Sequence, residues 1–177
     1  MKGAKSTNKL SFYLARMAAR GVTAEQVLAK TGLNAERIFS DAFRANPQQY
    51  RQVILNIIEL TGDPCIGIAI GAEFKISYLG VLGYAALSAA TLEQAREVFT
   101  KYHSLSEHIF TSTNHISDGR WFSEIRDTFM LGDVIRFAVE EFVSRTIELA
   151  SSITNKPFPI LEMYLTYAPP VDLAPYV

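Results

Sequence analysis

Cysteine and long apolar runs are both scarce in this sequence. Cys65 is its single cysteine, which excludes an internal disulfide and any zinc site built from several cysteines. We expect Cys65 to be a small buried apolar residue. No apolar stretch is long enough to span a bilayer, and the opening residues MKGAKSTNK do not resemble a signal peptide. The sequence therefore predicts a soluble, cytoplasmic protein.

An excess of positive charge is also lacking. The chain has 17 Lys and Arg against 18 Asp and Glu, for a formal net charge of −1. A free-standing DNA-binding domain usually carries a clear basic excess, because phosphate contacts dominate its affinity. We therefore do not expect this chain to bind DNA by itself.

The usual sequence patterns of catalysis and metal binding are missing too. His103 and His108 are five residues apart and do not share a helical face, while His115 falls on a predicted strand. There is no Gly-x-Ser-x-Gly motif, Walker loop or dinucleotide fingerprint. The adjacent Glu140 and Glu141 fit the solvated face of a helix. We expect no enzymatic activity, no metal and no cofactor.

What the sequence does contain is helical punctuation, from the start to about residue 75. Thr23 with Gln26, and Asn46 with Gln49, have the spacing of capping boxes, and Pro47 suits a first helical position. The run CIGIAIG at residues 65–71 predicts a short helix whose glycines allow another backbone to pack closely.

The segment from Gly21 to Phe39 looks at first like a DNA-binding helix-turn-helix. That motif needs a small residue four positions before its turn glycine, where this chain has the bulky Leu28. Its second helix would also direct Glu36 at phosphates. We interpret the segment as a structural pair of helices.

The second half changes from a helical period to a period of two. Residues 77–92 fit a short helix or a buried strand, and Thr91 begins a further helix. From Glu107 to Asp127 the alternation around Asp118-Gly119 predicts a β-hairpin, with Trp121 to Arg126 on its returning strand.

A long helix is predicted from Asp133 to Ile153, and a last strand from Pro159 to Tyr167. The fold class is therefore α+β. A helical part (residues 1–75) precedes an α+β part (residues 76–177), in which a small antiparallel or mixed sheet of hairpin and late strand packs with the long helix. Because little follows the late strand, the chain resembles a fragment.

Three sequence stretches together resemble a known family. ELTGDPCIGIAIG at 59–71, LGVLGYAALSAATLEQA at 79–95 and KYHSL at 101–105 are similar to the N-terminal domain of AraC-type transcription regulators, in the branch with an arabinose-binding-like domain. GVTAEQVLAKTGL and the tail PILEMYLTYAPP also fit that branch.

The resemblance implies that residues 1–177 are a single N-terminal regulatory domain. It implies a small-molecule effector, a homodimer, and DNA binding only through a C-terminal helix-turn-helix domain absent from this chain. The alternative, from the residues alone, is a protein-interaction or dimerisation module without a small ligand. An enclosed cavity with polar groups would favour a sensor, and an exposed apolar patch would favour a docking module.

Five residues are candidates for effector binding: Tyr84, Tyr102, Trp121, Phe122 and Arg126. The aromatic residues would supply apolar walls, with ordinary core packing as the alternative role for each. Arg126 could hold a ligand carboxylate through a bidentate pair if it points inward, and is a surface residue if it points outward.

Overall fold

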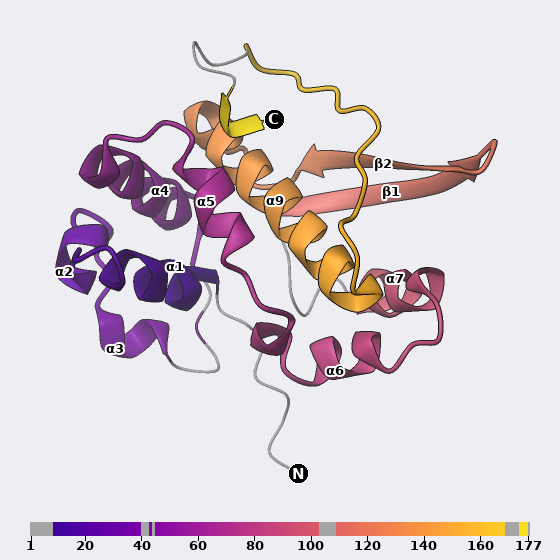
Figure 1. Cartoon of the computed structure of the whole chain (residues 1–177). Coiled ribbons are helices and arrows are strands. Elements are labelled where there is room, and N and C mark those ends of the chain that lie inside the picture. The colour runs from indigo at the N-terminus through magenta and orange to yellow at the C-terminus, as the bar shows by residue number, and fades with distance from the viewer. Residues whose placement is uncertain (1–8, 40–42, 44, 103–108, 169–173, 177) are drawn as a thin grey trace.

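Helix α9 (Ile135–Thr154) runs through the middle of the molecule, and the other elements are arranged around it (Figure 1). The computed structural model describes residues 9–39, 43, 45–102, 109–168 and 174–176. The described part is mostly helical, with one two-stranded antiparallel sheet. The predicted α+β class therefore holds only in the coarser sense of helices plus a hairpin.

The N-terminal helices begin and end close to where the sequence predicts. They are α1 (Lys9–Ala18), α2 (Ala24–Val27), α3 (Ala35–Ile38), α4 (Pro47–Thr61) and α5 (Ile66–Ala72). Complete capping boxes at Thr23 and Asn46 start α2 and α4, which confirms both predictions. Gly62, with a φ of 63°, ends α4 in the left-handed conformation that glycine adopts at low cost.

The helix-turn-helix-like segment forms the α2–α3 pair, and each of its helices has four residues. Its apolar side chains are taken up by the core: Val27, Leu28 and Ile38 are all buried. The pair is therefore part of the packing of the N-terminal helices, as its bulky Leu28 indicates.

The stretch that fitted either a helix or a strand is helical. It contains the 3₁₀ helix η1 (Ile76–Leu79) and α6 (Val81–Leu87), which is followed by α7 (Leu92–Lys101). Thr91 caps α7 by accepting a hydrogen bond from the backbone N–H of Gln94. Backbone hydrogen bonds within this stretch are local, for example from the N–H of Gly80 to the oxygen of Ser77 and from the N–H of Tyr84 to the oxygen of Gly80.

The predicted hairpin is confirmed. Strands β1 (Phe110–Ser117) and β2 (Arg120–Asp127) pair in antiparallel register around the turn residues Asp118 and Gly119, which both have positive φ. The predicted start at Glu107 lies outside the described residues, as do His103, His108 and most of KYHSL.

Helices α5 and α9 approach each other unusually closely, because α5 presents glycines to α9. A Cβ added to Gly67 would lie 2.6 Å from the backbone oxygen of Phe137, and one added to Gly71 would lie 2.5 Å from that of Glu141. The close packing predicted for CIGIAIG is confirmed. The long helix itself is preceded by the 3₁₀ turn η2 (Gly132–Val134), so it begins two residues after Asp133.

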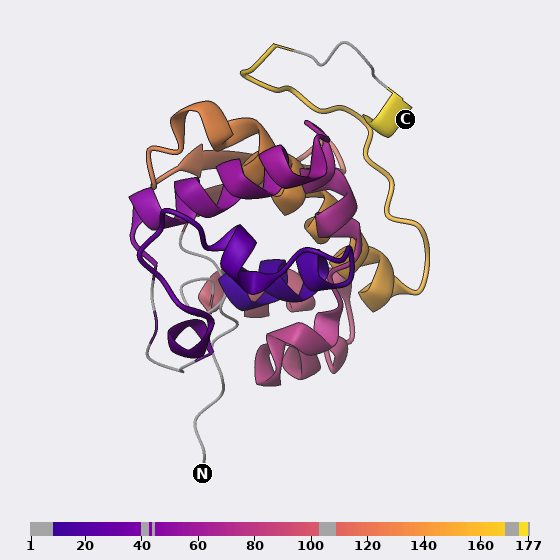
Figure 2. The same ribbon diagram turned by 90° about the vertical axis from the view of Figure 1, so that its left-hand side faces the viewer.

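The predicted late strand at Pro159 to Tyr167 is wrong. After Asn155 ends α9 in the left-handed conformation, residues 157–165 have no regular structure and run along the outside of the molecule (Figure 2). A strand needs a neighbouring strand to accept its backbone hydrogen bonds. This segment contacts the hairpin through side chains instead. The 3₁₀ turn η3 (Ala174–Tyr176) follows.

The core lies between the N-terminal helices and α9. Tyr13 of α1 packs against Phe137 of α9 with ring centroids 5.7 Å apart, and its hydroxyl lies 2.7 Å from that of Tyr50 on α4. Among the described residues no single helix is long and apolar enough to cross a membrane. Only α4 and α5 taken together meet that criterion, and they are bent by 103° relative to each other.

Candidate functional site

Trp121 lies where three elements of the chain meet. The guanidinium carbon of Arg96, from α7, is 5.7 Å from the indole centroid. The indole Nε1–H donates to Oδ1 of Asn114 on β1 at 3.2 Å. The ring of Phe158, from the segment after α9, is 6.4 Å away in an edge-on arrangement. Trp121 nevertheless keeps 40% of its surface exposed, so the cluster is open on one side.

The hairpin register explains why Trp121 faces this junction. Successive side chains on a strand point to opposite faces, so Trp121 and Ile125 share a face of β2. Ile125 packs against the core, and Phe110 on the same face packs on Phe142 of α9 at 5.4 Å. The inner face of the hairpin therefore packs on the core at the end that contains Phe110 and Ile125. Trp121, on the same face but nearer the turn, lies outside the core and contacts α7.

Arg96 is the cation of this cluster. Its neighbour Ala95 is fully buried and fixes the position of α7, while Arg96 itself is half-buried. Within the described part of the chain no carboxylate pairs with Arg96. Most of the other described arginines do pair with a carboxylate, namely those at 16, 20, 51, 120, 126, 136 and 145.

The structure does not bring the five predicted site residues together. Phe122 and Arg126 lie on the face of β2 opposite to Trp121. Phe122 stacks on His115 at 5.0 Å, and Arg126 pairs with Glu124 at 3.0 Å with its side chain 71% exposed. Arg126 therefore points outward, where it is a surface residue.

Neither tyrosine is among the described residues that contact Trp121. Tyr84, on α6, is 65% exposed. Tyr102 is the C-cap residue of α7, and the ammonium of Lys101 lies 5.4 Å from its ring centroid. Of the five candidates, Trp121 alone belongs to the cluster at the junction. The sequence did not predict Arg96, Asn114 and Phe158 as residues of this site. Arg96 falls on the polar side of an amphipathic helix, and nothing local distinguishes it from the surface arginines.

A second polar cluster lies on α9 and is buried. Glu141 is completely buried between Lys9 of α1, with Nζ–Oε2 at 2.8 Å, and Arg145, with Nε–Oε1 at 3.2 Å. Glu140 is also buried and pairs with Arg136 at 2.7 Å. The prediction that both glutamates form a solvated face is therefore wrong. The close approach of α5, together with α1, withdraws this side of α9 from water.

The segment near the C-terminus contacts the same cluster. The hydroxyl of Tyr176 donates to Oε1 of Glu140, and a guanidinium N–H of Arg136 lies 2.8 Å from Sγ of Cys65. Burial raises the pKa of Cys65 and that of Tyr176, so both groups are protonated near neutral pH. A thiol held in this form is a poor nucleophile, and Cys65 is buried as predicted.

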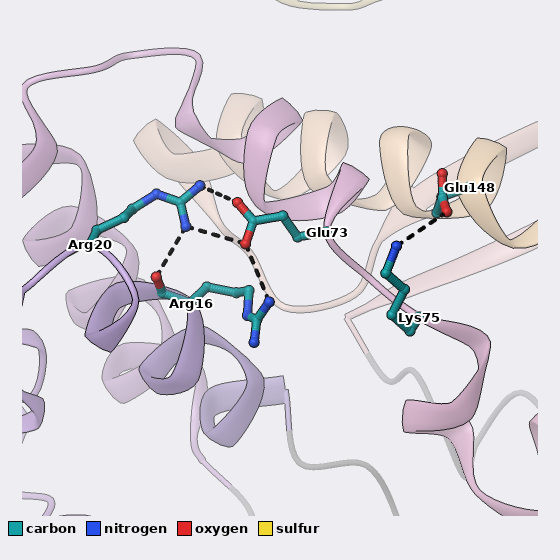
Figure 3. Close-up of polar contacts among 5 residues, drawn as sticks. All are labelled: Arg16, Arg20, Glu73, Lys75 and Glu148. Carbon is teal, nitrogen blue, oxygen red and sulfur yellow. Dashed lines mark hydrogen bonds and ion pairs between the residues drawn. The ribbon is translucent and has the colours of Figure 1, made fainter.

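A third group of charges joins α1 to the end of α5. Arg16 and Arg20 both reach the carboxylate of Glu73, and Lys75 lies 3.9 Å from Glu148 of α9 (Figure 3). Hydrogen bonding from Arg20 is the main cause that lowers the pKa of Glu73. These ion pairs connect α1, the end of α5 and α9.

The described residues contain no group of three or more His, Cys, Asp or Glu side chains placed to hold a metal ion. The clusters on α9 and at Glu73 each combine carboxylates with cations of the same chain. The junction at Trp121 differs, since it combines exposed aromatic surface with a guanidinium that pairs with no carboxylate of the described residues.

Comparison with known proteins identifies the family. Residues 21–177 match the family described as the arabinose-binding domain of AraC transcription regulators, N-terminal. The chain belongs to this AraC family. It is 26% identical, over 164 residues, to the ornithine utilization regulator of Pseudomonas aeruginosa.

The alignment covers 85% of this chain and 48% of that relative, so the chain spans about half the length of the curated protein it matches. The resemblance predicted from the sequence is confirmed. The AraC-type chain is the N-terminal regulatory domain of a transcription regulator, and its family is not an enzymatic one.

Proposed function

We propose that this AraC-type domain binds a small-molecule effector at the Trp121 junction and thereby controls a DNA-binding region in the rest of the protein. The observation that carries the proposal is the position of Trp121. It is held by Arg96 of α7, Asn114 of β1 and Phe158 of the segment after α9, and it remains partly exposed. Binding sites of small molecules combine such apolar surface with a few polar groups.

The junction also suggests how binding would be transmitted. Phe158 and Glu162, which lies 3.7 Å from Arg120 of the hairpin, belong to the segment that leads from α9 toward the C-terminus. An effector that contacts Trp121 would change how this segment rests on the hairpin. A ligand shifts a conformational equilibrium only by its difference in affinity for the two states. An effector that contacts the segment after α9 would have different affinities for the state in which this segment rests on the hairpin and the state in which it is released.

The relative supports a regulatory role, because it is named as a regulator and is about twice as long as the aligned region. In this proposal residues 1–177 form a single N-terminal regulatory domain, and specific DNA binding belongs to the region that follows. At 26% identity the relative does not fix the effector, which depends on the chemistry of the junction.

A mobility-shift assay on the longer protein, with DNA from its own upstream region and a panel of metabolites, tests the proposal. One or more metabolites should change the DNA affinity of the wild-type protein. Trp121→Ala should remove that response and leave DNA binding without effector unchanged, while Phe122→Ala, on the opposite face of β2, should retain it. A full effector response from Trp121→Ala would contradict the assignment of the effector site to the Trp121 junction.

The alternative function, a docking or dimerisation module, is favoured by one observation. Apolar side chains remain exposed on the hairpin and on the segment after α9: Ile116 by 61%, Leu161 by 70% and Tyr164 by 88%. A second copy of this chain is the occupant we propose, in line with the homodimer that the family resemblance implies. Light scattering on wild type and on Leu161→Ser/Tyr164→Ser should show a dimer that the double variant weakens, and a wild-type monomer at micromolar concentration would remove this alternative.

A further inference from the structure

The contacts of Arg96 limit the chemical class of effector that this site can bind. Its guanidinium lies over the Trp121 ring, and a cation–π contact uses the face of the guanidinium or its positive charge, not its N–H groups. The five N–H donors lie in the guanidinium plane and can still form hydrogen bonds. Arg96 is half-buried, so its donors remain accessible to a ligand.

Among the described residues no carboxylate lies within ion-pair distance of Arg96, although Glu93 and Glu97 are on the same helix. In the described part of the chain, Arg96 lies in no ion pair and no hydrogen bond, whereas Arg120 and Arg126 on the nearby hairpin pair with Glu162 and Glu124. A carboxylate or phosphate group binds a guanidinium through two parallel hydrogen bonds, a geometry that arginine favours. The donor set is therefore suited to a planar or tetrahedral anion supplied from outside.

The surface beside Arg96 is aromatic. Trp121 is 40% exposed, and Phe158 approaches it edge-on at 6.4 Å. The indole N–H is engaged by Asn114, so the indole offers its apolar face to a ligand. An anion without an apolar part would leave this surface in water, while a ligand with a ring or an alkyl chain would cover it.

We propose that Arg96 and Trp121 bind a small organic anion, with Arg96 holding its carboxylate or phosphate group and Trp121 and Phe158 contacting its apolar part. The inference rests on the proposed function and specifies the chemistry of the same site. It assigns to Arg96 the anion-binding role that the sequence suggested for Arg126.

Trp121 is the single tryptophan of the sequence, so its fluorescence reports on this site directly. The chain is titrated with benzoate, hexanoate and phenyl phosphate, and with benzamide and hexanamide as neutral compounds of matched shape. Saturable changes in Trp121 emission should occur with at least one anion, at concentrations about tenfold or more below those needed for its matched amide. A preference for phenyl phosphate over benzoate would assign the group as a phosphate, and the reverse would assign it as a carboxylate.

Two variants test the residue. Arg96→Gln should remove the preference for the anion, and Arg96→Lys should retain only part of it, because an ammonium lacks the two-pronged geometry. Arg37→Gln is the matched control, since Arg37 is exposed on α3 and pairs with no carboxylate among the described residues. Helical circular dichroism on each variant verifies folding.

The inference is overturned if the amides bind as tightly as the anions, if no anion saturates the Trp121 signal, or if Arg96→Gln keeps the preference in a folded chain. These failures are distinct from failure of the proposed function. An uncharged effector found in the mobility-shift screen, with its response dependent on Trp121, would leave the proposed function in place and remove only this inference.

Discussion

At the scale of single residues, the buried charges of α9 are the groups whose environment differs most from that of a surface side chain. Glu141 is completely buried, and two cations from different helices, Lys9 and Arg145, neutralise it. A buried ion pair adds little compared with apolar packing, but removing one partner leaves an uncompensated charge in the interior. The position is therefore sensitive to loss of charge.

We expect Glu141→Gln to lower the free energy of unfolding by about 3 kcal/mol or more, because Lys9 and Arg145 would remain buried without their anion. Urea denaturation followed by circular dichroism measures the change. Glu148→Gln, on the same helix but partly exposed and 3.9 Å from Lys75, should cost less than about 1 kcal/mol. Equal effects of the two variants would show that the burial of Glu141 does not determine the loss in the free energy of unfolding.

Glu73 predicts a dependence of stability on pH. Hydrogen bonding from Arg20 lowers the pKa of Glu73 below its ordinary value of 4.5. A carboxyl with a lowered folded-state pKa stabilises the fold above its unfolded pKa, and this contribution is lost as the pH falls through the folded pKa. Glu73→Gln should therefore reduce the loss of stability below pH about 4.5. Melting temperatures from pH 7 to pH 3 test this, and an unchanged acid profile would count against it.

At the scale of elements, the contact between α5 and α9 depends on the glycines of α5. An alanine Cβ at Gly71 would lie 2.5 Å from the backbone oxygen of Glu141 and 2.8 Å from Cβ of Ser144. Such an approach can be relieved only by moving the helices apart. Because Ser144 also donates to the backbone oxygen of Ile68, separation would disrupt that hydrogen bond too.

We expect Gly71→Ala to destabilise the chain by about 1–3 kcal/mol, the usual cost of overpacking. The sign is informative, since alanine in place of glycine inside a helix is otherwise favourable by up to about 1 kcal/mol. Ala69→Ser, on the exposed side of α5, is the control and should change little. Chemical denaturation gives both values, and a stabilised Gly71→Ala would mean that α5 and α9 are less closely packed.

At the scale of the whole molecule, the charge balance argues against DNA binding by residues 1–177 alone. The net charge is −1, and the α2–α3 pair that resembles a DNA-reading motif has its apolar residues in the core. Binding to DNA needs several phosphate contacts from lysine and arginine. Most of the described arginines already pair with carboxylates of the same chain.

We therefore expect residues 1–177 alone to show no sequence-dependent DNA binding in a mobility-shift assay at physiological salt. The longer protein, with its own upstream DNA, is the positive control for the assay. Sequence-dependent binding at nanomolar concentration by residues 1–177 alone would contradict this expectation. It would indicate that Arg37 and its neighbours on α3 contact DNA.

By itself, the sequence determined the features that depend on neighbouring residues. Capping at Thr23 and Asn46, the glycines of CIGIAIG and the hairpin around Asp118-Gly119 were all predictable. Each depends on hydrogen bonds or backbone freedom within a few residues, or on simple alternation. The family was predictable too, because several short motifs occur in order along the chain.

Only the tertiary structure decided the features that depend on distant partners. Residues 157–165 have the composition of a strand, but no neighbouring strand pairs with them in the described part of the chain. Glu141 has the sequence context of a surface residue, and it is buried because α5 and α1 close over it. Arg96 and Trp121 are 25 positions apart in the sequence, and their contact exists only because α7 and the hairpin both pack against α9. Burial and side-chain contacts between elements are set by the packing of the whole chain, and local sequence patterns do not encode it.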